Sequence, residues 1–238
     1  MNKNQLDDKF VILAGMPKCG STSLFEYMSA HPKIVGAYKK EPNYFLPPEL
    51  RFYRISVGSR SKVLAEYIQD YLEAFPSVDG QQVYRLDGSI EYCNSWKSAE
   101  AIHKHLTNVK LIFIFRNPVD RFISLYRFQK QTHRLPIDTT LEQYMQGIDG
   151  KEELTHRAYS VGRYAERLRP FWECFENRHI LLLSFSELRD NPLQLMQKVC
   201  AFLDIDATLY DNYDFKRHNV TRTAKNTRID HLQHKLIV

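Results

Sequence analysis

The chain has few cysteines and no long apolar run. Its four cysteines, at 19, 93, 174 and 200, include no C-x-x-C pair, and a chain of 238 residues is long enough to fold without disulfides, which favours a reducing compartment. The longest apolar runs, residues 111–115 and 180–183, are far shorter than the roughly 20 residues of a membrane helix. The first ten residues lack the apolar core of a secretory signal. We therefore expect a soluble, cytoplasmic protein with no membrane span.

The sequence also lacks the marks of several protein classes. With 43% hydrophobic and 26% charged residues and no internal repeat, it is not disordered, collagen-like or a coiled coil. Its net charge of +5 suits an anionic ligand but is small for a nucleic-acid-binding protein. Its nine histidines and four cysteines do not have metal-ligand spacing. The length favours a single domain over residues 1–238, and we expect no metal and no nucleic-acid partner.

Short apolar runs alternate with helical patterns along the chain. We expect strands over 10–14, 83–86, 109–115 and 179–184, and helices over 21–30, 62–75, 95–106, 118–130, 160–175 and 193–203. This alternation predicts an α/β, P-loop-like three-layer fold, with a central parallel sheet flanked by helices. Ligands of such sheets bind at the carboxyl ends of the strands. The polar segment 134–156 is expected to be a mobile flap or a substrate-side insertion.

The turn after the first expected strand, GMPKCGSTS at 15–23, almost spells the phosphate-binding loop G-x-x-x-x-G-K-[ST]. Its two glycines let the backbone N–H groups point inward, and the following helix offers its N-terminal donors to an anion. Ser21 stands where a nucleoside triphosphatase has lysine, and the lysine of this chain, Lys18, lies inside the loop. The sequence therefore predicts a phosphate site, and the alternative is a tight turn that binds nothing.

The second motif follows the apolar strand VKLIFIF. A phosphate-loop hydrolase would end this strand with Asp to hold Mg²⁺, but here Arg116 follows it. A permanently charged guanidinium suits a second phosphate, and Ser124, eight positions later and about two helical turns away, would approach the same anion. The alternative is an ion pair of Arg116 with Asp120 or Glu91. Arg121 is expected to be solvated or ion-paired.

Together, these motifs resemble those of the sulfotransferases that use 3′-phosphoadenosine 5′-phosphosulfate (PAPS). PKCGSTSL at 17–24 is similar to the family's 5′-phosphosulfate loop, and RNPVDRFISLY at 116–126 is similar to its 3′-phosphate motif. KEPNYF at 40–45 resembles the K-E-x-x-F segment of the heparan-sulfate-type and related carbohydrate sulfotransferases. GRY at 162–164 and DNP at 190–192 resemble parts of their later helices, so the resemblance covers nearly the whole chain.

The resemblance implies a role for each matching residue. Lys18 would contact the bridging oxygen of PAPS, and Arg116 and Ser124 would bind its 3′-phosphate. The 5′-phosphate would be held by the loop residues Cys19, Gly20, Ser21, Thr22 and Ser23. The basic C-terminal stretch 215–228 would close over the 3′-phosphate and adenine, or else be a solvated tail. Its candidate residues are Arg217, Arg222 and Lys225, of which we choose Arg222.

Glu41 falls on the family's catalytic-base position, where its carboxylate would take the acceptor's proton as sulfur is attacked. The alternative is a surface carboxylate paired with Lys39 or Lys40. Asp87 and Glu91 are two other candidate bases. They lie in LDGSIEY, where the carbohydrate enzymes read E-K-[ST]-P-x-Y, so a glycine replaces that lysine and the family's substrate contact is absent.

The resemblance implies an enzyme that transfers a sulfuryl group from PAPS to a hydroxyl or amine, without a metal, by in-line displacement. The acceptor is expected to be a carbohydrate or glycolipid, and adenosine 3′,5′-bisphosphate (PAP) is the second product. Two alternatives stay open from the residues alone. One is a Mg²⁺-dependent P-loop nucleotide kinase, and the other is a non-catalytic binder of RNA or acidic polysaccharide. The sequence identifies neither the acceptor nor the oligomeric state.

Overall fold

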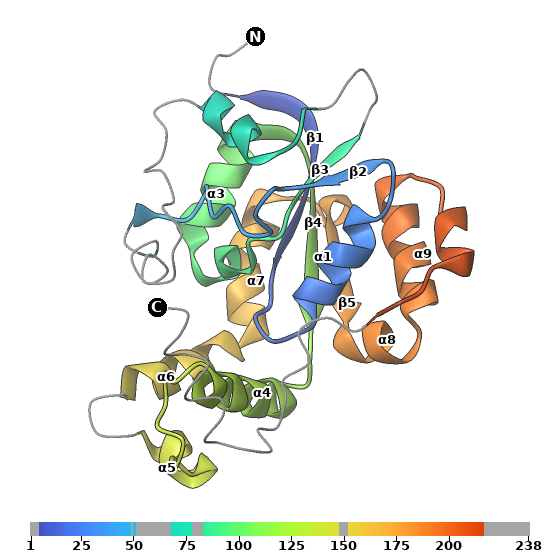
Figure 1. Ribbon diagram of the computed structural model, residues 1–238. Coiled ribbons are helices and arrows are strands. Elements are labelled where there is room, and N and C mark those ends of the chain that lie inside the picture. The colour runs from blue at the N-terminus through green and yellow to red at the C-terminus, as the bar shows by residue number, and fades with distance from the viewer. Residues whose placement is uncertain (1–4, 49, 51–67, 78–82, 148–151, 217–238) are drawn as a thin grey trace, which may run out of the picture. The chain divides into compact units, whose positions relative to one another are not determined.

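A computed structural model describes residues 5–48, 50, 68–77, 83–147 and 152–216 (Figure 1). The chain divides into two compact units. Of the described residues, those up to 116 and those in 163–216 form the first unit, and those in 117–162 form the second. No helix of the described residues combines the length and the apolar content that crossing a membrane requires.

The first unit is built on a five-stranded sheet with the order β2-β3-β1-β4-β5, and every neighbouring pair is parallel. This result confirms the predicted parallel sheet. The register pairs Ile12 of β1 with Asp87 of β3, and Gly15 of β1 with Phe113 of β4, so the strands end at one shared edge. The strands are β1 (Leu6–Gly15), β2 (Ile34–Gly36), β3 (Tyr84–Asp87), β4 (Leu106–Phe115) and β5 (Ile180–Ser184).

Helices cover both faces of this sheet, as predicted. Figure 1 shows α3 and α7 on one side of the sheet and α1, α8 and α9 on the other. These helices are α1 (Ser21–Ser29), α3 (Trp96–His105), α7 (Tyr164–Cys174), α8 (Phe185–Asp190) and α9 (Pro192–Leu203). The 3₁₀ helices of the unit are η1 (Ile68–Ala74), η2 (Ile90–Asn94), η3 (Asn177–His179) and η4 (Thr208–Asn212).

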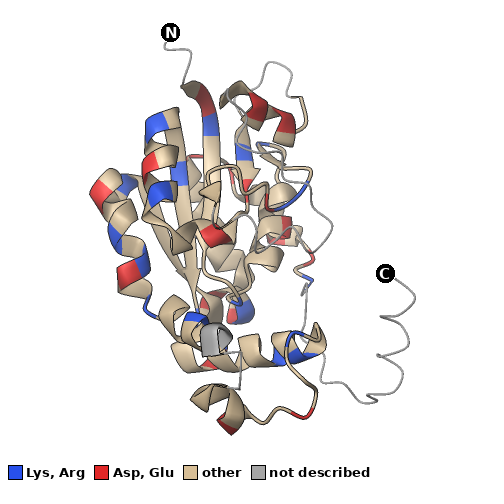
Figure 2. Cartoon of the chain, turned by 90° about the vertical axis from the view of Figure 1, so that its left-hand side faces the viewer, with Lys and Arg blue, Asp and Glu red and all other residues tan. Residues whose placement is uncertain are grey.

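The charged residues of the described chain do not separate by sign in the view of Figure 2. Lys and Arg are interspersed there with Asp and Glu along the same helices.

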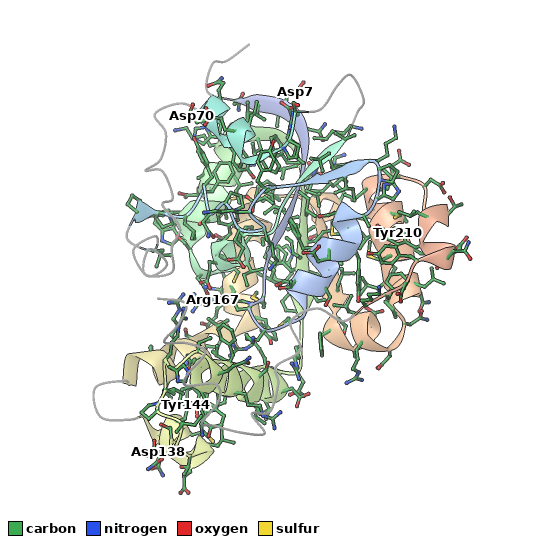
Figure 3. The ribbon with its side chains drawn as sticks, viewed as in Figure 1. Asp7, Asp70, Asp138, Tyr144, Arg167 and Tyr210 are labelled. Carbon is green, nitrogen blue, oxygen red and sulfur yellow. The ribbon has the colours of Figure 1, made fainter. Side chains whose placement is uncertain are left out.

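The second unit contains α4 (Pro118–Gln131), α5 (Leu141–Gln146) and α6 (Glu152–Val161), and each pair of these helices is in contact. Its small core includes Phe122 and Tyr144, the latter labelled in Figure 3. The segment 134–156, expected to be a flap or insertion, contains α5 and the start of α6. Arg121, expected to be solvated or ion-paired, is instead buried, and its guanidinium donates a hydrogen bond to the Ala158 carbonyl on α6.

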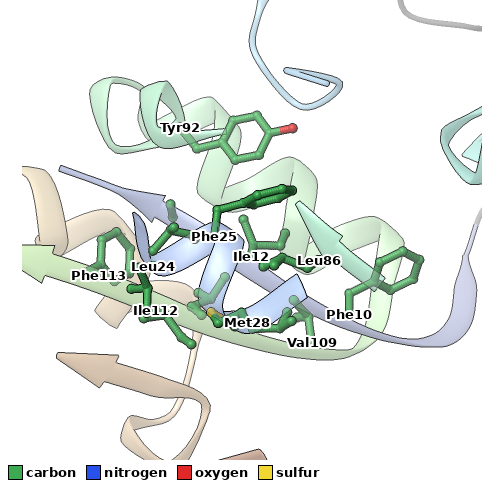
Figure 4. Close-up of a cluster of buried hydrophobic side chains, with 14 of the residues drawn as sticks. Phe10, Ile12, Leu24, Phe25, Met28, Leu86, Tyr92, Val109, Ile112 and Phe113 are labelled. Carbon is green, nitrogen blue, oxygen red and sulfur yellow. The ribbon is translucent and has the colours of Figure 1, made fainter. Parts of the chain in front are cut away.

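The core of the first unit explains why its central strands have continuous apolar runs, which made them easy to predict from the sequence. Residues 11–14 of β1 and 111–114 of β4 are wholly buried, as expected of parallel strands with helices on both faces. Figure 4 shows side chains of α1 meeting those of β1, β3 and β4 in one cluster. The labelled members include Ile12, Leu24, Phe25, Met28, Leu86, Ile112 and Phe113. This packing fixes the start of α1 at the carboxyl end of β1.

Some boundaries differ from the prediction. β4 begins at Leu106, directly after α3, so no loop separates them. Where one helix was expected over 160–175, α6 ends at Val161 and α7 starts at Tyr164. Of the helix expected over 62–75, residues 62–67 lie outside the described chain and 68–74 form a 3₁₀ helix. The short elements β2 and α8 were not predicted, although a Ser184–Glu187 capping box marks the start of α8.

Candidate active site

The loop between β1 and α1 has the shape that an anion site requires. Gly20 has a left-handed φ of 86°, and a Cβ placed there would lie 2.8 Å from the Leu188 side chain and 2.9 Å from the Phe185 ring. Only glycine therefore fits this position without strain. Ser21 begins α1 immediately afterwards, so the positive end of the helix dipole faces the loop.

Two side chains of the loop, those of Ser21 and Cys19, are buried but have different partners. Ser21 is 5% exposed, and its Oγ accepts a hydrogen bond from Lys40 Nζ at 3.1 Å. Cys19 is wholly buried, and its thiol donates to the Pro17 carbonyl at 3.6 Å. An anion would therefore meet the backbone of Cys19, not its sulfur.

Three cations gather at this loop. Burial of the ammonium group, together with the nearby charges of Arg116 and Lys40, lowers the pKa of Lys18 from its usual 10.5 to about 8. Two of these cations were predicted for the donor site, and Lys40 was considered only as an ion-pair partner of Glu41. Positive charges crowded in this way favour the binding of a negatively charged group.

Arg116 follows β4 and presents its guanidinium 4.6 Å from the centre of the Phe185 ring. Its Nε is buried and has no hydrogen-bond partner among the described residues. A buried N–H of this kind is costly unless a ligand satisfies it. The predicted alternative partner Glu91 instead accepts a hydrogen bond from Asn94 Nδ2 at 2.6 Å. The geometry therefore fits the anion-binding role of Arg116.

The segment that carries Glu41 is held from the end of β3. Gly88 N donates to the Lys40 carbonyl at 2.8 Å, and Asn43 N donates to Ser89 Oγ at 2.8 Å. Phe45 N donates to the Tyr92 hydroxyl at 3.2 Å. These bonds place the backbone of residues 40–45, called here the base segment, alongside residues 88–92. We therefore infer that the position of Glu41 depends on β3 as well as on its own loop.

The carboxylate of Glu41 lies 3.5 Å from Lys40 Nζ, so the predicted ion pair with Lys40 exists. The same ammonium group reaches Ser21 of the donor loop. Glu41 therefore lies next to the loop and not on a remote surface. A base for the acceptor has to lie close to the donor in this way.

Asp87, one of the alternative bases, is wholly buried beneath the base segment. Its carboxylate accepts hydrogen bonds from the Tyr71 hydroxyl at 2.7 Å, the Tyr92 hydroxyl at 2.9 Å and Ser89 N at 2.8 Å. Burial raises the pKa of Asp87, and these hydrogen bonds oppose the rise. A carboxylate enclosed in this way supports Tyr92 and Ser89, and it does not reach an acceptor.

The roles of two predicted site residues are not tested by the structure. Ser124 is part of α4, in the second unit, and it is partly buried. Arg222, with Arg217 and Lys225, lies outside the described residues. The roles of Ser124 and Arg222 stay predictions.

Curated proteins that are similar to this chain include two sulfotransferases. The chain is 25% identical over 217 residues to the bifunctional heparan sulfate N-deacetylase/N-sulfotransferase 1 of Mus musculus, covering 87% of this chain and 24% of that protein. It is 22% identical over 245 residues to carbohydrate sulfotransferase 15 of Homo sapiens, covering 81% of this chain and 43% of that protein. The chain thus spans less than half the length of these relatives.

Solved structures share the fold. The structure of a sulfotransferase from Alicyclobacillus acidocaldarius superposes with a TM-score of 0.68 at 20% identity, covering 97% of this chain and 92% of that one. The sulfotransferase domain from the curacin biosynthetic pathway superposes with a TM-score of 0.52 at 14% identity, covering 91% and 82%. The family described as the sulfotransferase domain matches residues 8–237, and the chain therefore belongs to the sulfotransferase domain family.

Proposed function

We propose that this protein transfers a sulfuryl group from PAPS to a hydroxyl or amine of an acceptor molecule. The observation that carries the proposal is the convergence of Lys18, Lys40 and Arg116 at the β1–α1 loop. These charges repel one another, and the buried Arg116 Nε has no partner among the described residues. A ligand with negative charge at the loop and at the end of β4 would offset the repulsion between these cations and would accept a hydrogen bond from Arg116 Nε.

The residues fit the two anionic ends of such a donor. The start of α1, with Ser21, Thr22 and Ser23, would hold the 5′-phosphosulfate through backbone and hydroxyl donors. Arg116 would hold the 3′-phosphate, because its guanidinium is permanently charged and keeps an N–H to donate. Ser124 and Arg222 are proposed as additional ligands of the 3′-phosphate.

Each catalytic side chain has one task in the proposed reaction. Glu41 takes the proton from the acceptor oxygen or nitrogen as this atom forms its bond to sulfur. The bond between sulfur and the bridging oxygen breaks, and its electron pair stays on that oxygen, which becomes part of PAP. Lys18 stabilises the developing negative charge there. With a pKa of about 8, Lys18 is mostly protonated at neutral pH and can carry out this task.

For the acceptor we propose a carbohydrate or glycolipid hydroxyl. The support is the similarity over most of the chain to a heparan sulfate N-sulfotransferase and to carbohydrate sulfotransferase 15. We also propose a cytoplasmic location, because all four cysteines lie in the described chain and none of them forms a disulfide.

Calorimetric titration with PAP in the presence of EDTA tests the donor site. We expect binding with a Kd on the order of 1 µM or tighter, and loss of at least about tenfold in affinity for Arg116→Met. The matched control is Arg178→Met, because Arg178 is an exposed arginine on η3 that pairs with Glu176.

The same titration separates the alternatives. Binding of ATP that requires Mg²⁺, without binding of PAP, would replace the proposal by a nucleotide kinase. Affinity for RNA or polysaccharide that falls steeply with salt and survives both Lys18→Met and Arg116→Met would favour a polymer-binding protein.

A further inference from the structure

We propose that Lys40 is a further residue of the donor site, and that its ammonium group binds the sulfonate oxygens of the donor. In doing so it gives up its ion pair with Glu41 and leaves that carboxylate available to the acceptor. This inference rests on the proposed function and assigns a ligand to a part of the site for which the sequence predicted none.

The position of the ammonium group is the first argument. Lys40 Nζ lies 3.1 Å from Ser21 Oγ, at the start of α1, and 3.5 Å from Glu41 Oε1. It is therefore placed between the loop that would hold the donor and the carboxylate that would act on the acceptor. The sulfuryl group that passes from the donor to the acceptor would cross this same space.

The path of the Lys40 side chain is the second argument. A Cβ at Gly88 would lie 2.8 Å from Lys40 Cγ and 2.9 Å from the Lys40 carbonyl oxygen. Any side chain at 88 would therefore displace Lys40, and glycine leaves room for its stem. Position 88 is also where the resemblance places a lysine. In this chain residue 88 supplies no charge. The stem of the Lys40 side chain lies against Gly88, and its ammonium group reaches Ser21 of the loop.

Charge is the third argument. Lys40 and Arg116 both lower the pKa of Lys18, so the three cations share one small region. Glu41 supplies one negative charge beside Lys40. When the donor binds, its sulfonate brings a further negative charge to the loop. The Lys40 ammonium group can then exchange the Glu41 carboxylate for the sulfonate at little electrostatic cost.

A comparison of two ligands tests this inference, because PAP lacks the sulfuryl group that PAPS carries. The affinities of PAP and PAPS are measured by calorimetry on the full chain without acceptor. The variants are Lys40→Met, Lys40→Arg and, as matched control, Lys39→Met, which removes an exposed lysine one residue earlier. Thermal unfolding followed by circular dichroism shows that each variant is folded.

We expect Lys40→Met to weaken PAPS binding about tenfold and PAP binding less than about twofold. Lys40→Arg should recover most of the PAPS affinity, and Lys39→Met should change neither ligand. Equal losses for both ligands would assign Lys40 to the phosphate and overturn the inference. Unchanged affinities in Lys40→Met would show that Lys40 is only an ion-pair partner of Glu41, and this result would also overturn the inference. The proposed donor site would still be supported by the affinity of the wild type for PAP. If the wild type binds neither ligand, the proposed function fails as well.

Discussion

The donor loop at 15–23 and the base segment at 40–45 meet at one site but are shaped in different ways. The loop follows directly from a buried strand, turns at a glycine with positive φ, and opens a helix, so the features by which it is recognised lie close together in sequence, although Leu188 and Phe185 also pack against Gly20. The base segment lies outside helices and strands, and it is held by Gly88, Ser89 and Tyr92 at the end of β3. A locally shaped motif can be recognised from its spelling, whereas the contacts that hold the other segment come from more than forty positions away in the chain.

Removing the charge within the loop should have the largest effect. We expect Lys18→Ala to lower turnover of PAPS by about 100-fold or more, because one preorganised donor to the transition state is worth roughly 2.7 to 4 kcal/mol. Single-turnover formation of PAP in the presence of an acceptor measures this, with thermal unfolding as the check of the fold. Near-normal transfer by the variant would show that Lys18 has no part in the chemistry.

Removing a hydrogen bond that holds the base segment should lower turnover by a smaller factor and should not change the donor loop. Tyr92→Phe removes the hydrogen bond that Phe45 N donates and one of those that Asp87 accepts. We expect turnover to fall about tenfold, PAP affinity to stay constant, and the free energy of unfolding to fall by about 1–3 kcal/mol.

Tyr71→Phe is the matched control for this change. It also removes a hydrogen bond to Asp87, but among the described residues the Tyr71 hydroxyl makes no hydrogen bond to the base segment. A similar loss of stability with nearly normal turnover is expected. Equal loss of turnover in both variants would show that general destabilisation lowers turnover, and not the loss of the Tyr92 hydrogen bond to the base segment.

The pH dependence of PAP binding should show the smallest change. Lys18 has a pKa of about 8 in the free protein, and a bound anion favours its protonated form, so the pKa is higher in the complex. Affinity should therefore be nearly level from pH 7 to 7.5 and fall about fivefold by pH 9. Titrations across this range measure the change. Lys18→Met should bind PAP more weakly with little dependence on pH, and a persistent fall in that variant would assign the titration to another group.

The sequence predicted those features that depend on near neighbours. The alternation of apolar runs and helices gave the parallel sheet, and the spacing of Gly20 and Arg116 after two buried strands placed both at the same sheet edge. The site of Lys40 was missed because its path depends on the absence of a side chain at Gly88, which no local pattern reveals. The enclosure of Asp87 was missed for the same reason, since Tyr71 and Tyr92 reach it from two different segments.

The second unit was the least predictable part. Segment 134–156 is polar, and its helices are short, so the apolar periodicity that marks a helix is weak there. The capping box of Thr140 and Gln143 was a usable signal for the start of α5. Arg121 was misjudged because a charged side chain is seldom so fully buried.

One aromatic ring contacts two parts of the proposed donor site. Phe185, the first residue of α8, lies against Gly20 in the loop, and the guanidinium of Arg116 stacks on its ring. The phenyl group therefore touches both places where the two ends of the proposed nucleotide would bind. We expect a smaller residue at this position to remove the ring on which Arg116 lies, so that Phe185 would influence nucleotide affinity without itself binding the nucleotide.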